Sequence, residues 1–556
     1  MLGYEIVALD KQGENHQREL LDLHALTAQW SFLAVAFTVQ IFLGGTWAFN
    51  QIAAGNSNRE LNVSSFRRLH CWLGQKASNR ALSKGEKALV ALWTIWLLFL
   101  YLLHLTRRFG AIGMSQLPLH YALGRRSMNA GLQLLTRLPH DSMLSLHQLL
   151  GRIVFALFSL HAACYTYFFV KSGLLSTRIR DWDVVAGMGS YFCLVVLVLG
   201  SLGRVRTGNY RVFYTTHAVT SSLGIGLFFL HTPHARIMTA EMLAVRLADE
   251  LARRAGTRTL CGTVVTLLGT NLVRVTMDTP FPGEATIRPG QHLLLGRPPL
   301  GRSAATRAVM ARLFANPFTV ASVPEVDGQL VLVCRTCGSG SGGTARLSAV
   351  ARSLVMAEGI SHIPLTIEGP YGAAGRPAAE LVGNFERVLV IAGGVGATFG
   401  IPVYRNLRVA SMSSGGGGSH VRFMWVVRSL ADATWAFSGE RTAAELHGSE
   451  LYVTHQAQGR VEETRADAGL LGGDVELTEL SSSLDEQQHK CTEAAMVTFG
   501  RPHLSAMIDE ACAETTGGVA VLVCGPQRMV SELWACVRRL KKKGKQIYWH
   551  AEQFGT

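Results

Sequence analysis

The hydrophobic residues of this chain fall into long runs in its first half and into short runs in its second half. Five long runs match the roughly 20 residues that a helix needs to cross the hydrocarbon of a bilayer. They lie at 28–49, 87–106, 144–170, 184–203 and 212–231. Two segments are weaker candidates: 109–125 is short and carries Pro118, and 235–256 is amphipathic, which fits an interfacial helix equally well. Together they predict a helical membrane part of about seven helices.

From residue 257 onward the pattern is that of a soluble protein. Residues 259–372 alternate short β-rich runs with turns, which predicts a small antiparallel β-barrel. From 388 a buried strand, a glycine turn and a helix follow one another, as is typical of a doubly wound α/β domain. Residues 455–492 are polar and rather acidic, and we expect a disordered insertion there. The Gly-rich stretches at 338–343 and 413–419 are expected to be flexible loops.

The composition agrees with a hybrid of membrane part and soluble part. The chain is 48% hydrophobic with a mean hydropathy of +0.21, and it carries a net charge of +14. No basic patch with interleaved aromatic residues accompanies that charge, so we expect no nucleic-acid partner. With seven spans and a cytosolic second half, the cytosolic loops at 50–86, 124–143 and 204–211 hold twelve Lys and Arg residues against six in the opposite loops. This imbalance follows the positive-inside rule.

The first residues and the cysteines argue against a cleaved signal peptide and against a zinc-binding or disulfide-rich protein. The first 25 positions contain the acidic residues Asp10, Glu14, Glu19 and Asp22. That stretch does not resemble a cleaved signal peptide. Cys334 and Cys337 form one CxxC with no second pair, so the ten cysteines predict neither a zinc site nor a disulfide framework.

Two apolar segments each carry a pair of histidines fourteen residues apart. His147 and His161 lie in the segment 144–170, and His217 and His231 in the segment 212–231. Fourteen residues turn a helix by about 1400°, close to four full turns, so both rings of a pair leave on nearly one face, about 21 Å apart along the axis. That offset fits two stacked porphyrins, one near each membrane surface.

The pairing of these histidines follows from the chain direction. The two helices are separated by one span and therefore run in the same direction. His147 can face His217 near the cytosolic side, and His161 can face His231 near the outer side. Each facing pair would supply both axial ligands of one haem, which favours electron transfer over O₂ binding at the iron. A single histidine in a membrane helix is more often a hydrogen-bonding residue between helices, which is what we expect of His104 and His120.

The barrel segment contains a candidate site for a planar ring, in the stretches RPGQH (288–292) and ANPFTVAS (315–322). Pro317 and Phe318 can pack on such a ring, and Thr319 and Ser322 can hydrogen-bond its polar edge. Two further residues are expected to approach a pyrophosphate: Arg335 and Thr344. By itself the tetrapeptide NPFT also fits an ordinary turn in a barrel.

The α/β segment contains a candidate dinucleotide site. A buried strand ends in three glycines before a helix: Gly393, Gly394 and Gly396. Glycines let the backbone approach a phosphate, and the helix N-terminus attracts it. Arg428 and Ser429 end the next strand, where a cation and a hydroxyl suit the 2′-phosphate of NADPH, although a solvated loop arginine is the alternative. A further strand and the chain end supply the remaining candidates: Cys524, Gly525, Pro526 and Phe554.

These stretches together resemble the fungal ferric reductase and NADPH oxidase superfamily, most of all its shorter yeast metalloreductase branch. The four histidines, NPFT, GPYG (369–372), the GGVGAT turn and the CGP segment stand in the family order, and the likeness extends from about 107 to the C-terminus. The stretch 107–127 is similar to the family's helix before the first haem-binding helix. One departure is Asn316, where the family usually has a histidine before Pro-Phe-Thr.

The resemblance implies the cofactors and the domain order. It implies FAD at Pro317, Phe318 and Thr319, NADPH at the glycine turn, Arg428 and the CGP segment, and two b-type haems at the four histidines. Phe554 would cover the flavin until nicotinamide displaces it. The expected domains are N-terminal membrane helices (1–106), a ferric-reductase-type haem-binding membrane domain (107–256), an FAD-binding barrel (257–375) and an NADPH-binding α/β domain (385–556). The last two form a ferredoxin-NADP reductase-like pair.

The activity implied is a transmembrane, NADPH-dependent metalloreductase that passes electrons through FAD and two haems to ferric or cupric ions. A superoxide-producing NADPH oxidase is the nearest alternative. A transporter or channel with a redox-sensing nucleotide domain, and an inactive relative acting as a partner subunit, are the others. We expect a multi-pass protein of the plasma membrane or the endoplasmic reticulum, with cytosolic nucleotide-binding domains. The sequence identifies no protein partner.

Overall fold

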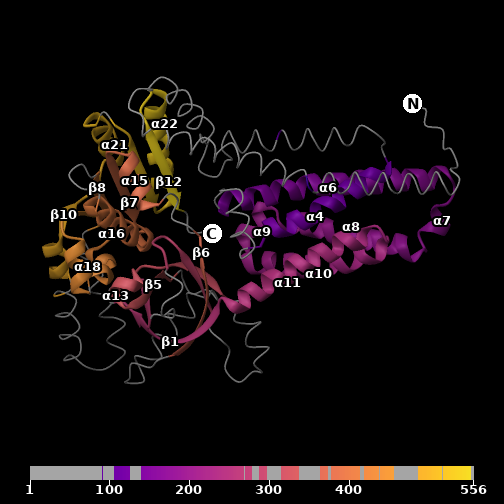
Figure 1. The fold of residues 1–556 in the computed structure, drawn as a ribbon, viewed down its shortest axis with the longest axis horizontal. Helices are drawn as coiled ribbons and strands as arrows, with labels where there is room; N and C mark the ends of the chain where they lie inside the picture. Colours follow the sequence, from indigo (N-terminus) through magenta and orange to yellow (C-terminus); the bar gives the residue numbers. More distant parts are fainter. Residues whose placement is uncertain are drawn as a thin grey trace. The chain divides into compact units, whose positions relative to one another are not determined.

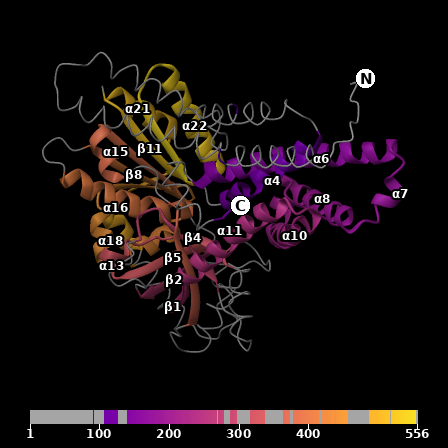
Figure 2. The same cartoon turned by 45° about the vertical axis from the view of Figure 1, so that its right-hand side comes forward.

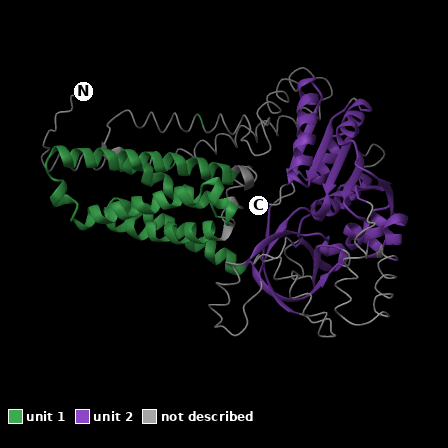
Figure 3. Cartoon of the chain, turned by 180° about the vertical axis from the view of Figure 1, so that it is seen from behind, with its two compact units in different colours: residues 1–255 green, residues 256–556 purple. Residues whose placement is uncertain are grey.

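A computed structural model gives the fold of most of the chain. It describes residues 106–125, 140–267, 270–278, 287–296, 315–336, 363–372, 377–413, 419–437, 439–455, 488–515 and 517–552, with Trp30, Ala91 and Glu486. Several predicted features lie wholly or almost wholly outside the described residues: the spans at 28–49 and 87–106, His104, Thr344, Phe554, the loop at 338–343 and most of the insertion 455–492. The chain forms two compact units, Met1–Ala255 and Gly256–Thr556 (Figure 3).

The first unit is a bundle of helices (Figure 1). Its long helices are α4 (Thr106–Leu123), α6 (His140–Lys171), α8 (Trp182–Gly200), α10 (Tyr210–His231) and α11 (Ala235–Ala255), and the short ones are α7 (Leu175–Arg178) and α9 (Gly203–Gly208). Contacts run from α4 to α6, α8, α10, α11 and back to α4, so that each long helix packs on two others. This closed ring of contacts brings the two histidine-bearing helices, α6 and α10, into one bundle.

Three helices of the bundle are long and apolar enough to cross a membrane, judged over the described residues by length and composition. They are Met143–Lys171, Trp182–Gly200 and Val212–His231. The two weaker candidates are helices as well: α4 continues through Pro118, and α11 packs on α4 and α10. The acidic Asp249 of α11 is buried and forms an ion pair with Arg125 (Nη1 to Oδ2 3.9 Å). The predicted total of about seven spans stays a prediction.

The core of the bundle follows a helical period. Leu146, Leu150, Val154 and Phe158 are buried along one face of α6, at intervals of four residues. They pack with α4, where a Cβ at Gly113 would lie only 3.1 Å from the Phe158 ring. Glycine on α4 therefore lets the two helices come close together.

The second unit begins with an antiparallel barrel. Its strands are β1 (Thr257–Thr266), β2 (Leu272–Asp278), β3 (His292–Gly296), β4 (Asn316–Thr319), β5 (Gln329–Arg335) and β6 (Ile363–Tyr371). They pair in the order β4-β3-β6-β1-β2-β5, and a bridge between Val320 and Leu332 joins the two ends. The short helix α13 (Pro324–Asp327) connects β4 to β5. The predicted small antiparallel barrel is confirmed.

A parallel sheet follows the barrel, and helices cover both its faces (Figure 2). Its strands are β7 (Arg387–Gly393), β8 (His420–Val427), β9 (Ser449–Val453), β10 (Ala495–Phe499), β11 (Val519–Cys524) and β12 (Ile547–Glu552), in the order β10-β9-β8-β7-β11-β12. Val388 and Val390 pack in the cluster of α15 (Ala378–Asn384) and α16 (Ala397–Ser413), while Leu389 and Ile391 pack with α21 (Leu504–Ala513) and α22 (Gln527–Lys542). The short helices η1 (Gly394–Gly396), η2 (Leu430–Ala433), α17 (Thr434–Phe437) and α18 (Glu440–Glu445) complete this doubly wound α/β fold, which is confirmed.

Candidate functional site

The structure brings the four histidines of α6 and α10 into two facing pairs. The ring centroids of His147 and His217 lie 6.3 Å apart, and those of His161 and His231 lie 6.4 Å apart. A metal bound to two opposed imidazole nitrogens at about 2.0 Å each holds the ring centroids a little over ~6 Å apart. Both pairs therefore fit a metal between two imidazoles.

In three of these four histidines, the ring nitrogen Nδ1 makes a hydrogen bond that fixes the orientation of the ring. Nδ1 of His147 donates to the carbonyl oxygen of His120 (2.9 Å), and Nδ1 of His231 donates to the carbonyl oxygen of Asp183 (2.8 Å). Nδ1 of His217 lies 3.2 Å from the hydroxyl of Ser201. When Nδ1 carries the hydrogen, the lone pair lies on Nε2 and is available to a metal.

His120 belongs to the same layer as the ligand candidates. Its ring stacks on that of His147 at 4.0 Å, and its Nε2 donates to the carbonyl oxygen of His147 (3.1 Å). This is the helix-to-helix hydrogen bond that the sequence predicted for His120, here between α4 and α6.

The NPFT stretch forms strand β4 at the edge of the barrel sheet. Thr319 and Ser322 are buried, Phe318 is half-buried and Pro317 is exposed. The Ser322 hydroxyl accepts from the backbone N–H of Val331 (3.0 Å), so it helps to hold β5 in place. Pro317 and Phe318 present an apolar surface on which a planar ring can pack.

Two aromatic residues near β4 were not singled out from the sequence. His292 of β3 lies directly opposite Thr319, and Tyr371 at the end of β6 faces the His292 ring at 6.1 Å. A Cβ at Gly372 would lie 3.0 Å from His292 Nδ1, so the glycine of GPYG leaves room for that ring. Although Asn316 replaces a histidine in β4, the neighbouring strand β3 thus places another imidazole, that of His292, beside β4. In the sequence, the feature that could have indicated this residue was the histidine at the end of RPGQH (288–292).

The glycine turn after β7 meets residues from two other strands. Gly394 has a positive φ of 55°, and a Cβ there would lie 3.3 Å from Arg335 Nη2 at the end of β5. A Cβ at Gly396 would overlap the carbonyl of Cys524, and one at Gly393 would lie 2.7 Å from Pro526. The turn, Arg335 and the CGP segment thus form one compact cluster, and a side chain at these glycines would break it.

Arg428 and Ser429 directly follow β8. Arg428 is exposed, and its guanidinium is free to approach an anion from solvent. The Ser429 hydroxyl oxygen is buried and has no hydrogen-bond partner among the described residues. A buried hydroxyl without a partner costs free energy, which a bound phosphate oxygen would recover. Both residues lie at the carboxyl ends of the parallel strands, where α/β sheets bind dinucleotides.

Cys524 ends β11 and pairs in register with Glu552 of β12 and with Ala392 of β7. Burial raises the pKa of its thiol well above the usual range, and the nearby Glu552 carboxylate acts in the same direction. The side chain is therefore a neutral thiol at physiological pH, and no reactive thiolate is expected there.

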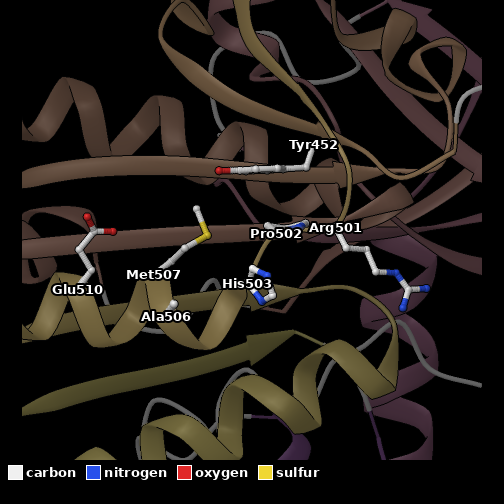
Figure 4. Close-up of a pocket in the computed structure, with 7 residues that line it drawn as sticks. All are labelled: Tyr452, Arg501, Pro502, His503, Ala506, Met507 and Glu510. Atoms are coloured by element: carbon white, nitrogen blue, oxygen red, sulfur yellow. The ribbon is translucent and has the colours of Figure 1, made fainter.

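An open pocket of about 580 Å³ lies beside the carboxyl ends of β9 and β10 (Figure 4). Tyr452, Arg501, Pro502, His503, Ala506, Met507 and Glu510 line it. The close-up shows the Met507 side chain turned toward Tyr452, with the Arg501 side chain extended from the loop after β10. Burial raises the pKa of Tyr452 to about 12, aided by Glu450, whose carboxylate accepts the phenol hydrogen (3.0 Å). Sequence reasoning missed this pocket, although Gly500 and Arg501 directly after a strand were a usable signal.

Three protein families match consecutive parts of the chain. The ferric reductase like transmembrane component family matches residues 109–228, an FAD-binding domain family matches 261–375, and the ferric reductase NAD binding domain family matches 385–538. The histidine pairs, the barrel with β4 and the parallel sheet with its glycine turn fall in these three segments in turn.

Several yeast proteins are similar over most of the chain. A probable metalloreductase AIM14 from Scheffersomyces stipitis is 24% identical, covering 74% of both chains. Another from Meyerozyma guilliermondii is 23% identical, covering 93% of this chain and 96% of the relative. The ferric/cupric reductase transmembrane component 2 of Saccharomyces cerevisiae is 23% identical over 77% of this chain and 58% of its own length.

Solved structures are similar at a lower level. A flavohemoglobin from Malassezia yamatoensis with bound FAD and heme is 15% identical, with 80% of this chain and 96% of that chain covered and a TM-score of 0.34. The Amycolatopsis cytochrome P450 reductase GcoB is 18% identical, with 54% and 70% covered and a TM-score of 0.33. Consecutive segments of the chain are thus similar to a ferric reductase transmembrane component, an FAD-binding domain and a ferric reductase NAD-binding domain, and the yeast metalloreductases are similar over most of its length.

Proposed function

We propose that this protein is a transmembrane metalloreductase that takes electrons from NADPH and delivers them to ferric or cupric ions across a membrane. The observation that carries the proposal is the pair of facing histidine pairs on α6 and α10, at 6.3 and 6.4 Å, in a chain that also holds FAD-binding and NAD-binding domains. The relative named a ferric/cupric reductase supports metal ions as the acceptor.

The bundle residues would hold two b-type haems. His147 and His217 would bind the iron nearer the cytosol, and His161 and His231 the iron nearer the outer surface. Bound FAD would supply the exchange between hydride transfer from NADPH and single-electron transfer, and bound haems would supply electron relay. Two imidazoles for each iron would be a donor set that suits electron relay rather than O₂ binding at the metal. The Nδ1 hydrogen bonds of His147, His217 and His231 would hold these three imidazoles in the tautomer that binds iron through Nε2.

The barrel residues would bind the flavin. Pro317 and Phe318 would pack on the isoalloxazine ring, and Thr319 would hydrogen-bond its polar edge. Where relatives of this family place a histidine, this chain has Asn316, whose side-chain amide still donates a hydrogen bond. His292 lies across from Thr319, and we assign to it the imidazole contact that position 316 no longer supplies.

The parallel-sheet residues would bind NADPH along the carboxyl edge. The glycines of the turn after β7 admit the pyrophosphate to the backbone, and Arg335 lies close enough to neutralise it. Arg428 and Ser429 would hold the 2′-phosphate. The pocket of Tyr452, Arg501 and His503 continues the same edge and offers an aromatic face and a cation to the adenosine end.

Aromatic and charged residues at the helix ends support a membrane position. Tyr167 and Trp182 are 65% and 69% exposed at the ends of α6 and α8 that lead into α7, as expected for an interfacial aromatic belt. Exposed Arg204 lies in α9, at the other end of the bundle. We place that end in the cytosol, with the nucleotide-binding domains, and the protein in the plasma membrane or the endoplasmic reticulum.

Membranes that contain the protein allow a direct test of the acceptor. NADPH-driven reduction of chelated ferric iron is measured beside superoxide release in the same preparation. Ferric reduction that exceeds superoxide release supports the metalloreductase. Superoxide as the main product, with little ferric reduction, would identify an NADPH oxidase instead. The His161→Ala variant serves as the control, because it is expected to lose both activities.

A further inference from the structure

The rings of three of the four ligand candidates, His147, His161 and His231, are each seated against a glycine of a neighbouring segment. A Cβ at Gly124, directly after the end of α4, would lie 2.9 Å from the His147 ring, and one at Gly110 of α4 would lie 2.9 Å from the His161 ring. A Cβ at Gly187 of α8 would lie 2.5 Å from the His231 ring. These distances are shorter than Cβ contacts tolerate, so each ring occupies space that only glycine leaves open.

A repeated geometry explains these glycines. In an α-helix the Cα–Cβ bond points toward the N-terminus, so the side chain at position i+4 covers the carbonyl of residue i. Glycine at i+4 uncovers that carbonyl, which can then accept a second hydrogen bond with its other lone pair. The His120 carbonyl accepts a hydrogen bond from His147, and Gly124 lies four residues after His120. The Asp183 carbonyl accepts one from His231, and Gly187 lies four residues after Asp183. We call such a carbonyl with its glycine a socket.

The glycines repeat at the interval of the ligands. Gly110 of α4 and Gly124, directly after α4, are fourteen residues apart. Helix α4 packs on α6, where His147 and His161 are also fourteen apart. On α8, which packs on α10, the position fourteen residues after Gly187 is Ser201. Each of the other three ligand histidines has a glycine against its ring. At His217 the corresponding residue is Ser201.

Ser201 changes the hydrogen bond at His217. Its hydroxyl donates to the carbonyl oxygen of Leu197 (2.6 Å), four residues earlier, and its oxygen lies 3.2 Å from His217 Nδ1. The hydroxyl stands between the imidazole and the helix carbonyl that a glycine would have exposed. His217 thus donates to a hydroxyl, whereas His147 and His231 donate directly to backbone carbonyls.

We propose that Ser201 is a positioning residue that orients His217 and gives the inner of the two proposed haems a redox potential distinct from that of the outer one. This inference rests on the haem ligation proposed above. An acceptor at Nδ1 makes the imidazole a stronger electron donor to iron, which favours the oxidised form and lowers the midpoint potential. Loss of the hydroxyl therefore raises the potential of the haem bound by His217 and leaves the other unchanged.

The test uses the full-length purified protein with its haems bound. Both haem midpoint potentials and the low-spin electron paramagnetic resonance signals are measured for wild type, Ser201→Ala, Ser201→Thr and Ser190→Ala. Ser190 is the matched control, because its hydroxyl also bonds the carbonyl four residues earlier on α8 (to Ala186, 2.8 Å). The inner haem is identified as the component that His217→Ala removes.

We expect Ser201→Ala to shift one midpoint upward, in the component assigned to His217, or to lose that haem alone. Ser201→Thr, which keeps the hydroxyl, should restore the wild-type value, and Ser190→Ala should match wild type. Unchanged midpoints and spectra in Ser201→Ala, with both haems bound, would overturn the inference and leave the proposed ligation intact. Equal shifts in Ser201→Ala and Ser190→Ala would also overturn it. Wild-type protein without haem would instead refute the proposed function itself.

Discussion

Arg405 of α16 and Asp327 of α13 form a two-pronged ion pair inside the second unit. Nη1 and Nη2 of the arginine donate to the two carboxylate oxygens at 2.8 Å each, and the Arg405 side chain is only 4% exposed. Arg405 Nε also bonds Glu445. Because α13 joins β4 to β5 and α16 follows the glycine turn, this pair ties the barrel to the parallel sheet.

Loss of the Asp327 carboxylate should destabilise the second unit. In Asp327→Ala the buried guanidinium of Arg405 keeps only one of its two acidic partners, Glu445. Removing one partner of a buried ion pair costs about 3 kcal/mol. Denaturant unfolding followed by tryptophan fluorescence measures the change. Arg441→Ala is the control, because its ion pair with Glu445 is solvent-exposed and contributes little. Equal stability of Asp327→Ala and wild type would show that the pair does not hold the two parts together.

The Gly187→Ala substitution should remove the outer haem selectively. The added Cβ would lie 2.5 Å from the His231 ring, and overpacking of this kind costs about 1–3 kcal/mol. Displacement of the ring should lower haem content from about two per chain to about one. Gly226→Ala is the matched control on α10, since a Cβ there meets nothing within 4 Å. Full haem content in Gly187→Ala would contradict the close seating of His231.

Arg428→Ala should weaken the preference for NADPH over NADH. A charge-assisted hydrogen bond contributes about 1.5–3 kcal/mol, so KM for NADPH should rise about tenfold or more while KM for NADH stays nearly constant. Steady-state ferric reduction with each nucleotide measures both constants. Arg538→Ala, an exposed arginine of α22, should change neither. An equal rise for both nucleotides would place the 2′-phosphate elsewhere.

Glu386 should make the stability of the parallel sheet depend on pH. Hydrogen bonds from the Thr515 hydroxyl and from the Gly517 N–H (2.9 Å) lower the pKa of its carboxyl below the ordinary 4.5. A lowered pKa adds stability that is complete above the ordinary value and is lost as pH falls through the folded value. The melting temperatures of wild type and Glu386→Gln should therefore differ by a constant amount from pH 7 to about 5 and converge below that. A difference that does not change with pH would rule out this linkage.

Much of the candidate site could be predicted because its signals are local or periodic. The fourteen-residue interval identified all four ligand candidates without knowledge of the packing, since a helix fixes which residues share a face. The glycine turn after β7 was equally visible, because its residues are adjacent in the chain. Thr344 and Phe554 remain predictions, as they lie outside the described residues.

The features that the sequence did not reveal depend on contacts between distant segments. Arg405 meets an acid 78 positions away, and His292 faces Thr319 only because β3 pairs with β4. Gly187 and Ser201 share the ligand interval, but they meet His231 and His217 only because α8 packs on α10. Such partners follow from tertiary packing, which local propensity and periodicity do not encode.

The difference spectrum of the purified protein, reduced by NADPH minus oxidised, tests the central claim most directly. The account predicts b-type haem bands of about two haems per chain, reduced by NADPH in wild type, and about half the amplitude in His161→Ala. Protein that is folded and holds FAD but shows no b-type bands would contradict the assignment of His147, His161, His217 and His231 as haem ligands.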